Sequence, residues 1–156
     1  MKKYFFIVLS ILLLSSCIFT NKTDPSIEFL MENAVDTLEI DDASYILDAF
    51  VYRDYFPGDS QELSLRSIIT LFRLDSLQIP SNISMIEQYV MWDDSLWVPD
   101  SIDQIDISLP PFKLKMASIG GPEWPIGSYV DVISKIRIGD IDHYLIKRHV
   151  EIIMTQ

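Results

Sequence analysis

The sequence predicts an all-β domain, and within that class an antiparallel β-sandwich of the immunoglobulin-like kind. From residue 37 onward, runs rich in Ile, Val, Tyr, Phe and Leu alternate with turn residues such as Pro, Gly, Asp and Asn. No long stretch with the period of a helix interrupts them. The prolines in this part fall between the runs, where they remove no hydrogen bond from a strand ladder. Short strands at such intervals favour a sandwich over an up-and-down barrel.

The first segment of the chain has the features of a targeting signal. Residues 1–16 combine two lysines with an apolar run too short for a comfortable bilayer span, and small residues follow the run. These features predict a secretory signal peptide. The run ends at Leu14-Ser15-Ser16-Cys17, which contains the only cysteine of the chain and resembles the lipobox of bacterial lipoproteins. The resemblance implies a diacylglyceryl group on the sulfur of Cys17, cleavage before this residue and acylation of the new amino terminus.

The lipid on Cys17 gives the expected location. Each buried methylene of a lipid chain contributes about 0.8 kcal/mol, so two or three chains form a stable membrane anchor. Residue 18 is Ile and not Asp. The resemblance to lipoproteins sorted by this position implies the outer membrane of a bacterial envelope more than the inner membrane. Because lipidation uses the sole thiol, we expect no disulfide, and the fold depends on its core.

The chain after the predicted signal peptide is strongly acidic. Residues 1–16 hold two of the twelve basic residues and none of the 23 acidic ones, so the net charge of residues 17–156 is −13. Such a charge repels phosphate backbones, which excludes nucleic acid as a partner. Basic or neutral proteins and divalent cations remain as partners. The same charge also keeps a tethered domain soluble.

Two segments are expected after the signal peptide. Residues 17–36 are predicted to be a lipidated polar tether, with one uncapped helical turn over residues 27–31. Residues 37–156 are predicted to form the β-domain. Its expected strands cover residues 37–40, 44–54, 63–74, 84–92, 96–98, 103–107, 112–118, 128–138 and 143–154.

The run 128–138 has the clearest strand pattern. Its even positions carry Val, Ser and Ile, whereas Asp, Lys and Arg occupy odd positions, which predicts a half-buried strand. Gly139 and Asp140 then supply turn residues, so this strand and the next are expected to form a hairpin. A second hairpin is expected between residues 89–92 and 96–98.

The segment from Ser118 to Gly127 holds a dense group of Gly and Pro and is expected to form a rigid corner. A phosphate-binding loop is excluded, because neither a Lys-Ser/Thr pair nor a helix follows the glycines. Trp124 is expected either to cap the end of the core or to stand exposed for a partner. We select Trp124, Glu123 and Trp97 as candidate contact residues.

Three segments resemble a group of small uncharacterised bacterial envelope domains. They are Tyr-Arg-Asp-Tyr-Phe-Pro at 52–57, the tryptophans at 92 and 97, and Gly-Gly-Pro-Glu-Trp-Pro-Ile-Gly-Ser-Tyr-Val-Asp-Val at 120–132. In that group they run approximately as Trp-Arg-Asp-Phe-x-Pro, a tryptophan-bearing hairpin, and Gly-Gly-Pro-x-Trp-x-x-Gly-x-x-Val-Asp-Val. The resemblance spans about residues 37–152 and implies a small β-domain without an assigned catalytic residue.

The sequence indicates neither a metal site nor a cofactor. His143 and His149 are expected on one face of the last strand, about 20 Å apart, which is too far for one metal ion. The loop aspartates match no calcium loop of the EF-hand type. Neither Gly-x-Ser-x-Gly nor Ser-x-x-Lys occurs in the chain.

These observations together predict a lipid-anchored envelope protein that is not an enzyme and whose domain binds a protein partner. Two alternatives stay open. One is a carbohydrate-active or other hydrolase that uses Asp/Glu pairs, with Trp92, Trp97 and Trp124 as platforms. The other is a structural spacer, which predicts no surface sensitive to mutation.

Overall fold

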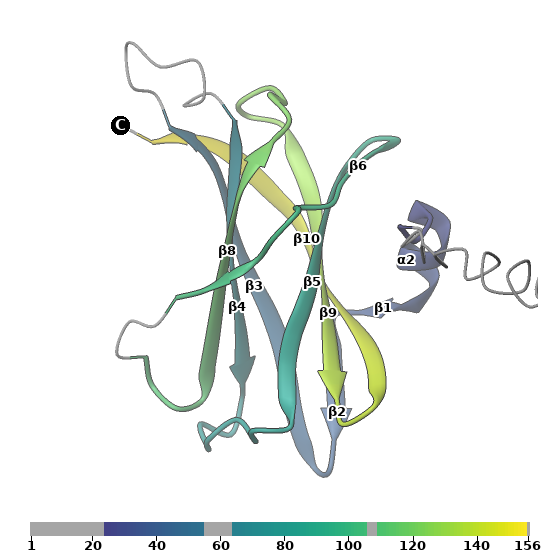
Figure 1. The fold of residues 1–156 in the computed structure, drawn as a ribbon, viewed down its shortest axis with the longest axis vertical. Coiled ribbons are helices and arrows are strands. Elements are labelled where there is room, and N and C mark those ends of the chain that lie inside the picture. Colours follow the sequence, from purple (N-terminus) through teal and green to yellow (C-terminus); the bar gives the residue numbers. More distant parts are fainter. Residues whose placement is uncertain (1–23, 55–63, 106–108, 156) are drawn as a thin grey trace, which may run out of the picture.

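The structure, a computed structural model, describes residues 24–54, 64–105 and 109–155. Within these ranges one short helix precedes ten strands (Figure 1). In chain order the elements are α2 (Ile27–Asn33), β1 (Ala34–Val35), β2 (Thr37–Ile40), β3 (Ala43–Asp54), β4 (Leu65–Arg73), β5 (Ile83–Trp92), β6 (Ser95–Trp97), β7 (Asp103–Gln104), β8 (Lys113–Gly121), β9 (Tyr129–Ile138) and β10 (Ile141–Thr155). The predicted all-β class is confirmed, and each predicted run contains a strand.

A curled sheet joins the described strands. Eight of them follow the order β6-β5-β9-β10-β3-β4-β8-β7, while β1 pairs with β10 and β2 with β3. The long strand β10 connects the two halves of the sheet, because residues 141–151 pair with β9 and residues 152–155 pair with β3. Figure 1 shows β3, β4 and β8 in one half and β5 and β9 in the other, with the two halves facing each other.

The expectation of antiparallel pairing throughout is wrong at two strand pairs. β10 runs parallel to β3, and β1 runs parallel to β10. Hairpins between strands that are neighbours in sequence are necessarily antiparallel. No hairpin connects β3 to β10, since Asp54 and Thr155 are 101 residues apart in sequence. The relative direction of β3 and β10 is set by how the sheet closes. The alternation of apolar and polar residues within each strand does not predict it.

The core lies between the two halves of the sheet. The even-numbered residues of β9 point into it, and Val130, Val132, Ser134 and Ile136 are each at most 2 % exposed. This confirms the face predicted from the period of two. From the opposite half, β3 and β4 contribute Val51, Leu65, Ile69 and Leu71 to the same cluster.

A polar network crosses this core. The amide of Gln88 on β5 donates a hydrogen bond to Ser67 on β4 and accepts one of 3.0 Å from the hydroxyl of Ser118 on β8. All three side chains are buried. The network therefore joins the two halves of the sheet through side chains.

Helix α2 begins at a regular N-cap. The hydroxyl of Ser26 accepts a 3.1 Å hydrogen bond from the N–H of Phe29, and Glu28 lies in the first turn, where the helix dipole favours an acid. The expected turn over residues 27–31 was thus too short, and the expectation that it lacks a cap was wrong.

The same helix packs on the outer side of β5, β9 and β10. Leu30 is fully buried there, in a second hydrophobic cluster. Its buried partners are Tyr89, Met91, Ile133 and Ile146. The assignment of residues 17–36 to a tether is therefore corrected for its second half: α2 is docked through Leu30, and β1 pairs with β10.

Candidate functional site

The three tryptophans gather at one end of the core. Trp97 and Trp124 are each 8 % exposed, and the rings of Trp92 and Trp124 lie 5.7 Å apart. Gly121 fits beneath them because a Cβ at this position would lie 2.8 Å from the ring of Trp97. Of the two placements expected for Trp124, the structure therefore has the cap of the core. Trp97 and Trp124 offer little surface to a partner.

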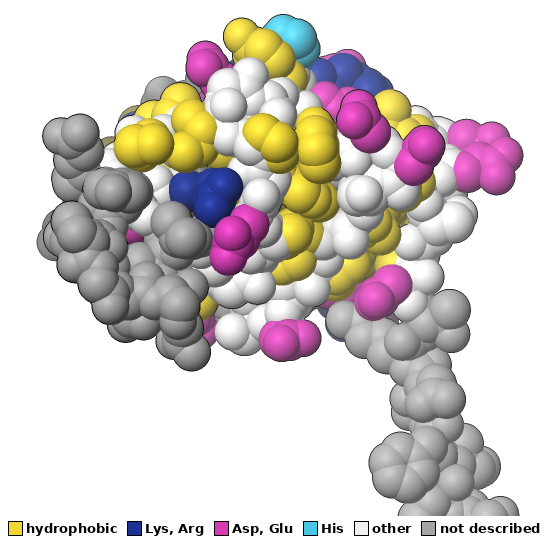
Figure 2. Space-filling view, turned by 90° about the horizontal axis from the view of Figure 1, so that it is seen from above, with side chains coloured by type: hydrophobic (Ala, Val, Ile, Leu, Met, Phe, Trp, Pro, Cys, Tyr) yellow, Lys and Arg dark blue, Asp and Glu magenta, His cyan; other side chains and the backbone are white. Residues whose placement is uncertain are grey.

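A partly buried arginine, Arg53, holds the corner around Trp124. One guanidinium nitrogen of Arg53 donates a 3.0 Å hydrogen bond to the backbone oxygen of Trp124, and the other lies 3.6 Å from the carboxylate of Glu123. The side chain of Glu123 is 61 % exposed, whereas that of Arg53 is 13 % exposed. Among the three candidate contact residues, only Glu123 thus lies on the surface. Figure 2 shows that acidic side chains are spread over the end of the molecule seen from above, between patches of apolar side chains.

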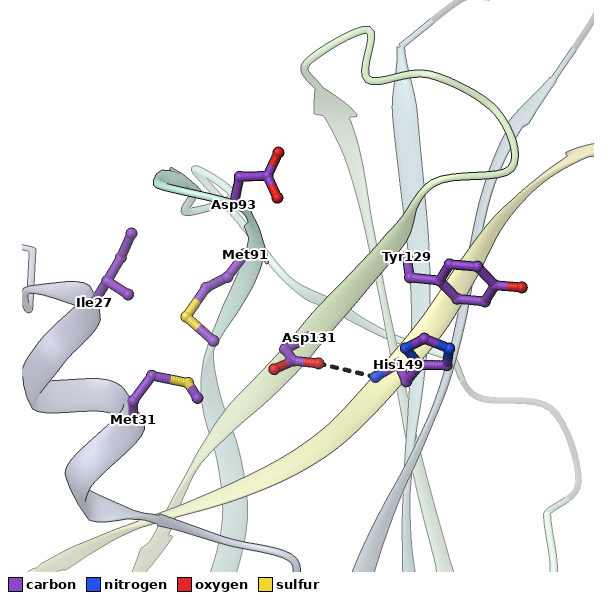
Figure 3. A pocket seen from close by; sticks show the side chains of 7 residues that line it. All are labelled: Ile27, Met31, Met91, Asp93, Tyr129, Asp131 and His149. Atoms are coloured by element: carbon purple, nitrogen blue, oxygen red, sulfur yellow. Dashed lines mark hydrogen bonds between the residues drawn. The ribbon is translucent and has the colours of Figure 1, made fainter.

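A pocket lies between helix α2, the end of β5 with the β5–β6 turn, the beginning of β9 and the bulged part of β10 (Figure 3). Its volume is about 190 Å³. The side chains that line it are Ile27, Met31, Met91, Asp93, Tyr129, Asp131 and His149. We call it the bulge pocket, because its wall includes an irregularity of β10.

The irregularity is a β-bulge between Lys147 and Val150. His149 lies within it with a φ of 58°, in the left-handed region. Its backbone N–H donates a 2.8 Å hydrogen bond to the carboxylate of Asp131, and its ring stacks on Tyr129 at 4.0 Å with an angle of 7° between the planes. The bulge also changes the alternation of β10, so the expectation that His143 and His149 share one face of a regular strand is wrong.

The conformation of His149 carries an energetic cost. A non-glycine residue in the left-handed region costs about 1–2 kcal/mol, although His tolerates it better than most residues. The hydrogen bond to Asp131 and the stacking on Tyr129 offset this cost. Because Tyr129 is 49 % exposed, the strained backbone presents an aromatic pair to solvent.

A second polar cluster lies on β5, β9 and β10. Lys135 is 3.0 Å from the carboxylate of Asp142 and 3.7 Å from that of Glu87, and Arg137 binds Asp142 with two hydrogen bonds. Tyr89 donates a hydrogen bond to Glu87. Burial, followed by this hydrogen bond, raises the pKa of Tyr89 far above its usual range. The hydrogen bonds from Arg137 and Lys135 lower the pKa of Asp142 to about 2.

The alternative of a hydrolase predicts a pair of carboxylates in one pocket. Asp93 and Asp131 both line the bulge pocket, but Asp131 accepts the hydrogen bond from His149 and lies 3.6 Å from Arg148. The carboxylates of the polar cluster face lysine and arginine. Among the described residues no group of three or more His, Cys, Asp or Glu side chains is placed to hold a metal ion.

Sequence reasoning missed the bulge pocket. Its signal in the sequence is Lys147-Arg148-His149, three consecutive polar residues between the apolar residues Ile146 and Val150 of β10. In a regular strand the middle residue, Arg148, would lie on the same face as Val150 and point toward the core. The run of three polar residues is therefore typical of an irregularity in the strand. The signal for α2 is the helical turn expected over residues 27–31, but so short a segment does not indicate that the helix packs on the sheet.

Comparisons with known protein families, with curated proteins and with solved structures find no match to this chain. No helix within the described ranges has the length and apolar character needed to cross a membrane. The predicted signal peptide of residues 1–16 and Cys17 lie outside the described residues, as do Tyr55 and Phe56 of the aromatic motif.

Proposed function

We propose that this protein is a lipid-anchored component of the bacterial envelope whose domain, an immunoglobulin-like β-sandwich, binds a protein partner through the bulge pocket. The order of the strands supports the finer fold. β3-β4-β8-β7 corresponds to A-B-E-D of such a sandwich, and β10-β9-β5-β6 corresponds to G-F-C-C′.

The observation that carries the proposal is the stacked pair of Tyr129 and His149 on a strained bulge. Strained backbone persists where the surrounding contacts fix it, and it clusters at functional sites. Here the strain orients an aromatic side chain that is half exposed. Tyrosine is enriched among the residues that dominate binding energy at protein interfaces.

The other walls of the pocket suit a protein contact. Met31 from α2 and Met91 from β5 supply flexible and polarizable side chains, which adapt to the shape of a partner. Asp93 supplies a carboxylate at the rim. The pocket is thus apolar at the helix and acidic toward the β5–β6 turn, a pattern that fits a partner with an apolar side chain beside a basic or neutral polar group.

The proposed anchor places this pocket near the membrane. Cys17 precedes Asp24 by seven residues, which span at most about 25 Å when extended. The pocket is lined by two residues of α2, the first described element after this segment. A partner at the bulge pocket is therefore expected to lie at or close to the same membrane.

A site-specific cross-link tests the contact in living cells. A photo-reactive benzoylphenylalanine at Tyr129 in the full chain is expected to capture a distinct envelope protein, and Met31→Asp is expected to reduce this capture. The matched control is the same probe at Leu77, an exposed residue of the β4–β5 connection. The proposed binding site is contradicted if the cross-linked product from position 129 is no stronger than the cross-linked product from position 77.

The anchor is tested separately. Mass spectrometry of the purified protein is expected to find a lipidated amino-terminal Cys17, and Cys17→Ser is expected to release the domain from the membrane fraction. An unmodified Cys17 or a retained Met1 contradicts the anchor without affecting the cross-linking result.

A further inference from the structure

The outer face of β3, β4 and β8 is covered by no other described element. Its outward positions are Ile46, Asp48, Phe50, Tyr52 and Asp54 on β3, Arg66, Ile68, Thr70 and Phe72 on β4, and Lys113, Lys115, Ala117 and Ile119 on β8. Phe50 and Ile119 are 44 % and 67 % exposed. We call this surface the outer face.

Two rows of cross-strand neighbours define the centre of the outer face. In the first row Phe50 pairs with Ile68, and Ile68 pairs with Ala117. The large and the small side chain thus flank the central isoleucine, each one strand spacing, about 4.8 Å, away. A hollow of about 230 Å³ lies beside them, lined by Asp48, Ala49, Phe50, Ile68, Thr70 and Lys115.

The second row repeats this arrangement with charges. Asp48 pairs with Thr70, and Thr70 pairs with Lys115. An acid and a base therefore flank the central threonine at the same spacing. Asp48 is also 3.8 Å from Lys147 of β10, and both of these side chains are about half exposed, so Asp48 remains accessible.

We infer that the outer face binds a second copy of this chain, with a two-fold axis running along β4. Such an axis exchanges the two sides of the face. It places Asp48 of each copy opposite Lys115 of the other, and Phe50 of each copy opposite Ala117 of the other. Ile68 and Thr70 lie on the axis; Ile68 faces its own counterpart, whereas Thr70 is only 8 % exposed and adds little contact. An interface related by a two-fold axis must be self-complementary in this way.

The other orientation of the axis does not give this match. A two-fold axis in the same plane but across the strands, through the second row, sets Asp48 opposite Asp48 and Lys115 opposite Lys115. Like charges placed opposite each other oppose association. The pattern of charge and size therefore selects the axis along β4, with the small crossing angle that packed sheets adopt.

The charge distribution over the molecule points to the same surface. The whole chain has a net charge of −11, so two copies repel each other over most of their surfaces. The outer face holds two acidic and three basic residues in the list above. It is a part of the molecule where a second copy meets little repulsion. Helix α2 lies on the other half of the sheet (Figure 1), so pairing through the outer face leaves α2 and the bulge pocket uncovered.

A cysteine on the axis tests the pairing in the full-length, membrane-bound protein. Ile68→Cys is expected to give a covalent dimer with a short bismaleimide cross-linker, since the two copies of position 68 face each other across sheets packed about 10 Å apart, a distance too long for a direct disulfide. Cys17 is the only native cysteine, and its contribution is measured in the unsubstituted chain. The matched control is Leu77→Cys, which is exposed and lies off the outer face.

Charge exchange then tests the arrangement itself. In the Ile68→Cys background, Asp48→Lys or Lys115→Asp alone is expected to lower the dimer yield about tenfold, because each places like charges opposite each other twice. Both changes together are expected to restore it. Thermal unfolding of each variant checks that the fold is intact.

Three results would overturn the inference. They are a dimer from Ile68→Cys no stronger than that from Leu77→Cys, a double charge exchange that fails to restore the yield, and a cross-link from position 68 to a different protein. None of these results bears on the contact at Tyr129, so the dimer and the proposed function stand or fall separately.

Discussion

The buried network around Gln88 allows a sharp test of what holds the two halves of the sheet together. We consider Gln88→Leu, which replaces the amide by an apolar side chain that is one bond shorter. The change leaves the hydroxyls of Ser67 and Ser118 in the core without the amide that bonds both. Neither serine gains access to water, since they are 0 % and 3 % exposed.

The cost follows from the two hydroxyl groups. A buried polar group that loses its partner costs about 1–3 kcal/mol. The two serines are direct neighbours on β4 and β8, so one hydroxyl can donate to the other after the substitution. This recovers part of the loss, and we expect the free energy of unfolding to fall by about 2–4 kcal/mol. A domain of this size has a total stability of about 5–15 kcal/mol.

The triple variant Ser67→Ala, Gln88→Leu, Ser118→Ala separates the network from the packing. Because it removes all three polar groups, it is expected to recover most of the stability lost in Gln88→Leu. Urea unfolding of the three proteins measures the difference, with Gln78→Leu as a matched control on an exposed glutamine. The reasoning is refuted if Gln88→Leu unfolds within about 0.5 kcal/mol of the parent, or if the triple variant is less stable than the single one.

Three further outcomes are expected. Gly121→Ala should lower the free energy of unfolding by about 1–3 kcal/mol, seen as a lower urea midpoint, because the new methyl group meets Trp97 at 2.8 Å. Leu30→Ala should speed hydrogen exchange in α2 and leave hydrogen exchange in β4 unchanged, because this leucine holds the helix on the sheet. Equal acceleration of exchange in β4 would contradict local docking of the helix. Asp142 has a pKa of about 2 in the folded state, below its value of about 3.9 in the unfolded state. Its ion pairs therefore stabilise the fold above about pH 4, and this stabilisation is lost as the pH falls toward 2. Asp142→Asn should therefore reduce the loss of stability between pH 5 and pH 2.5 in urea titrations, and an unchanged pH profile would count against the role of Arg137.

The strands were predictable because their information is local. Alternation of apolar and polar residues recurs within each strand, and the even residues of β9 gave the buried face correctly. The hairpins β5–β6 and β9–β10 also follow from local turn residues. At their turns Asp93 and Gly139 adopt positive φ angles, which Asp tolerates and Gly adopts freely.

The parts that sequence reasoning missed depend on contacts between distant residues. Ile133 lies on a face of β9 that is otherwise mostly polar, and it is buried in the hydrophobic cluster that Leu30 joins from the distant helix α2. The residues around Leu30 are too few to predict a packed helix by themselves, since isolated short helices are marginal. The placement of Trp124 is open from the sequence for the same reason: its ring packs against Trp92, and its backbone oxygen binds Arg53, 71 residues away in sequence.

The late position of β10 in the sequence has a consequence for export. Among the described strands, β10 alone connects the β5–β9 half to the β3–β4 half and pairs with β1, so these pairings are missing before this strand is synthesised. Such long-range pairings form slowly, because distant parts of the chain must first meet. If the chain is exported as proposed, the two halves of the sheet remain unjoined while the chain crosses the membrane. β10 then joins the two halves of the sheet in the compartment where the domain works.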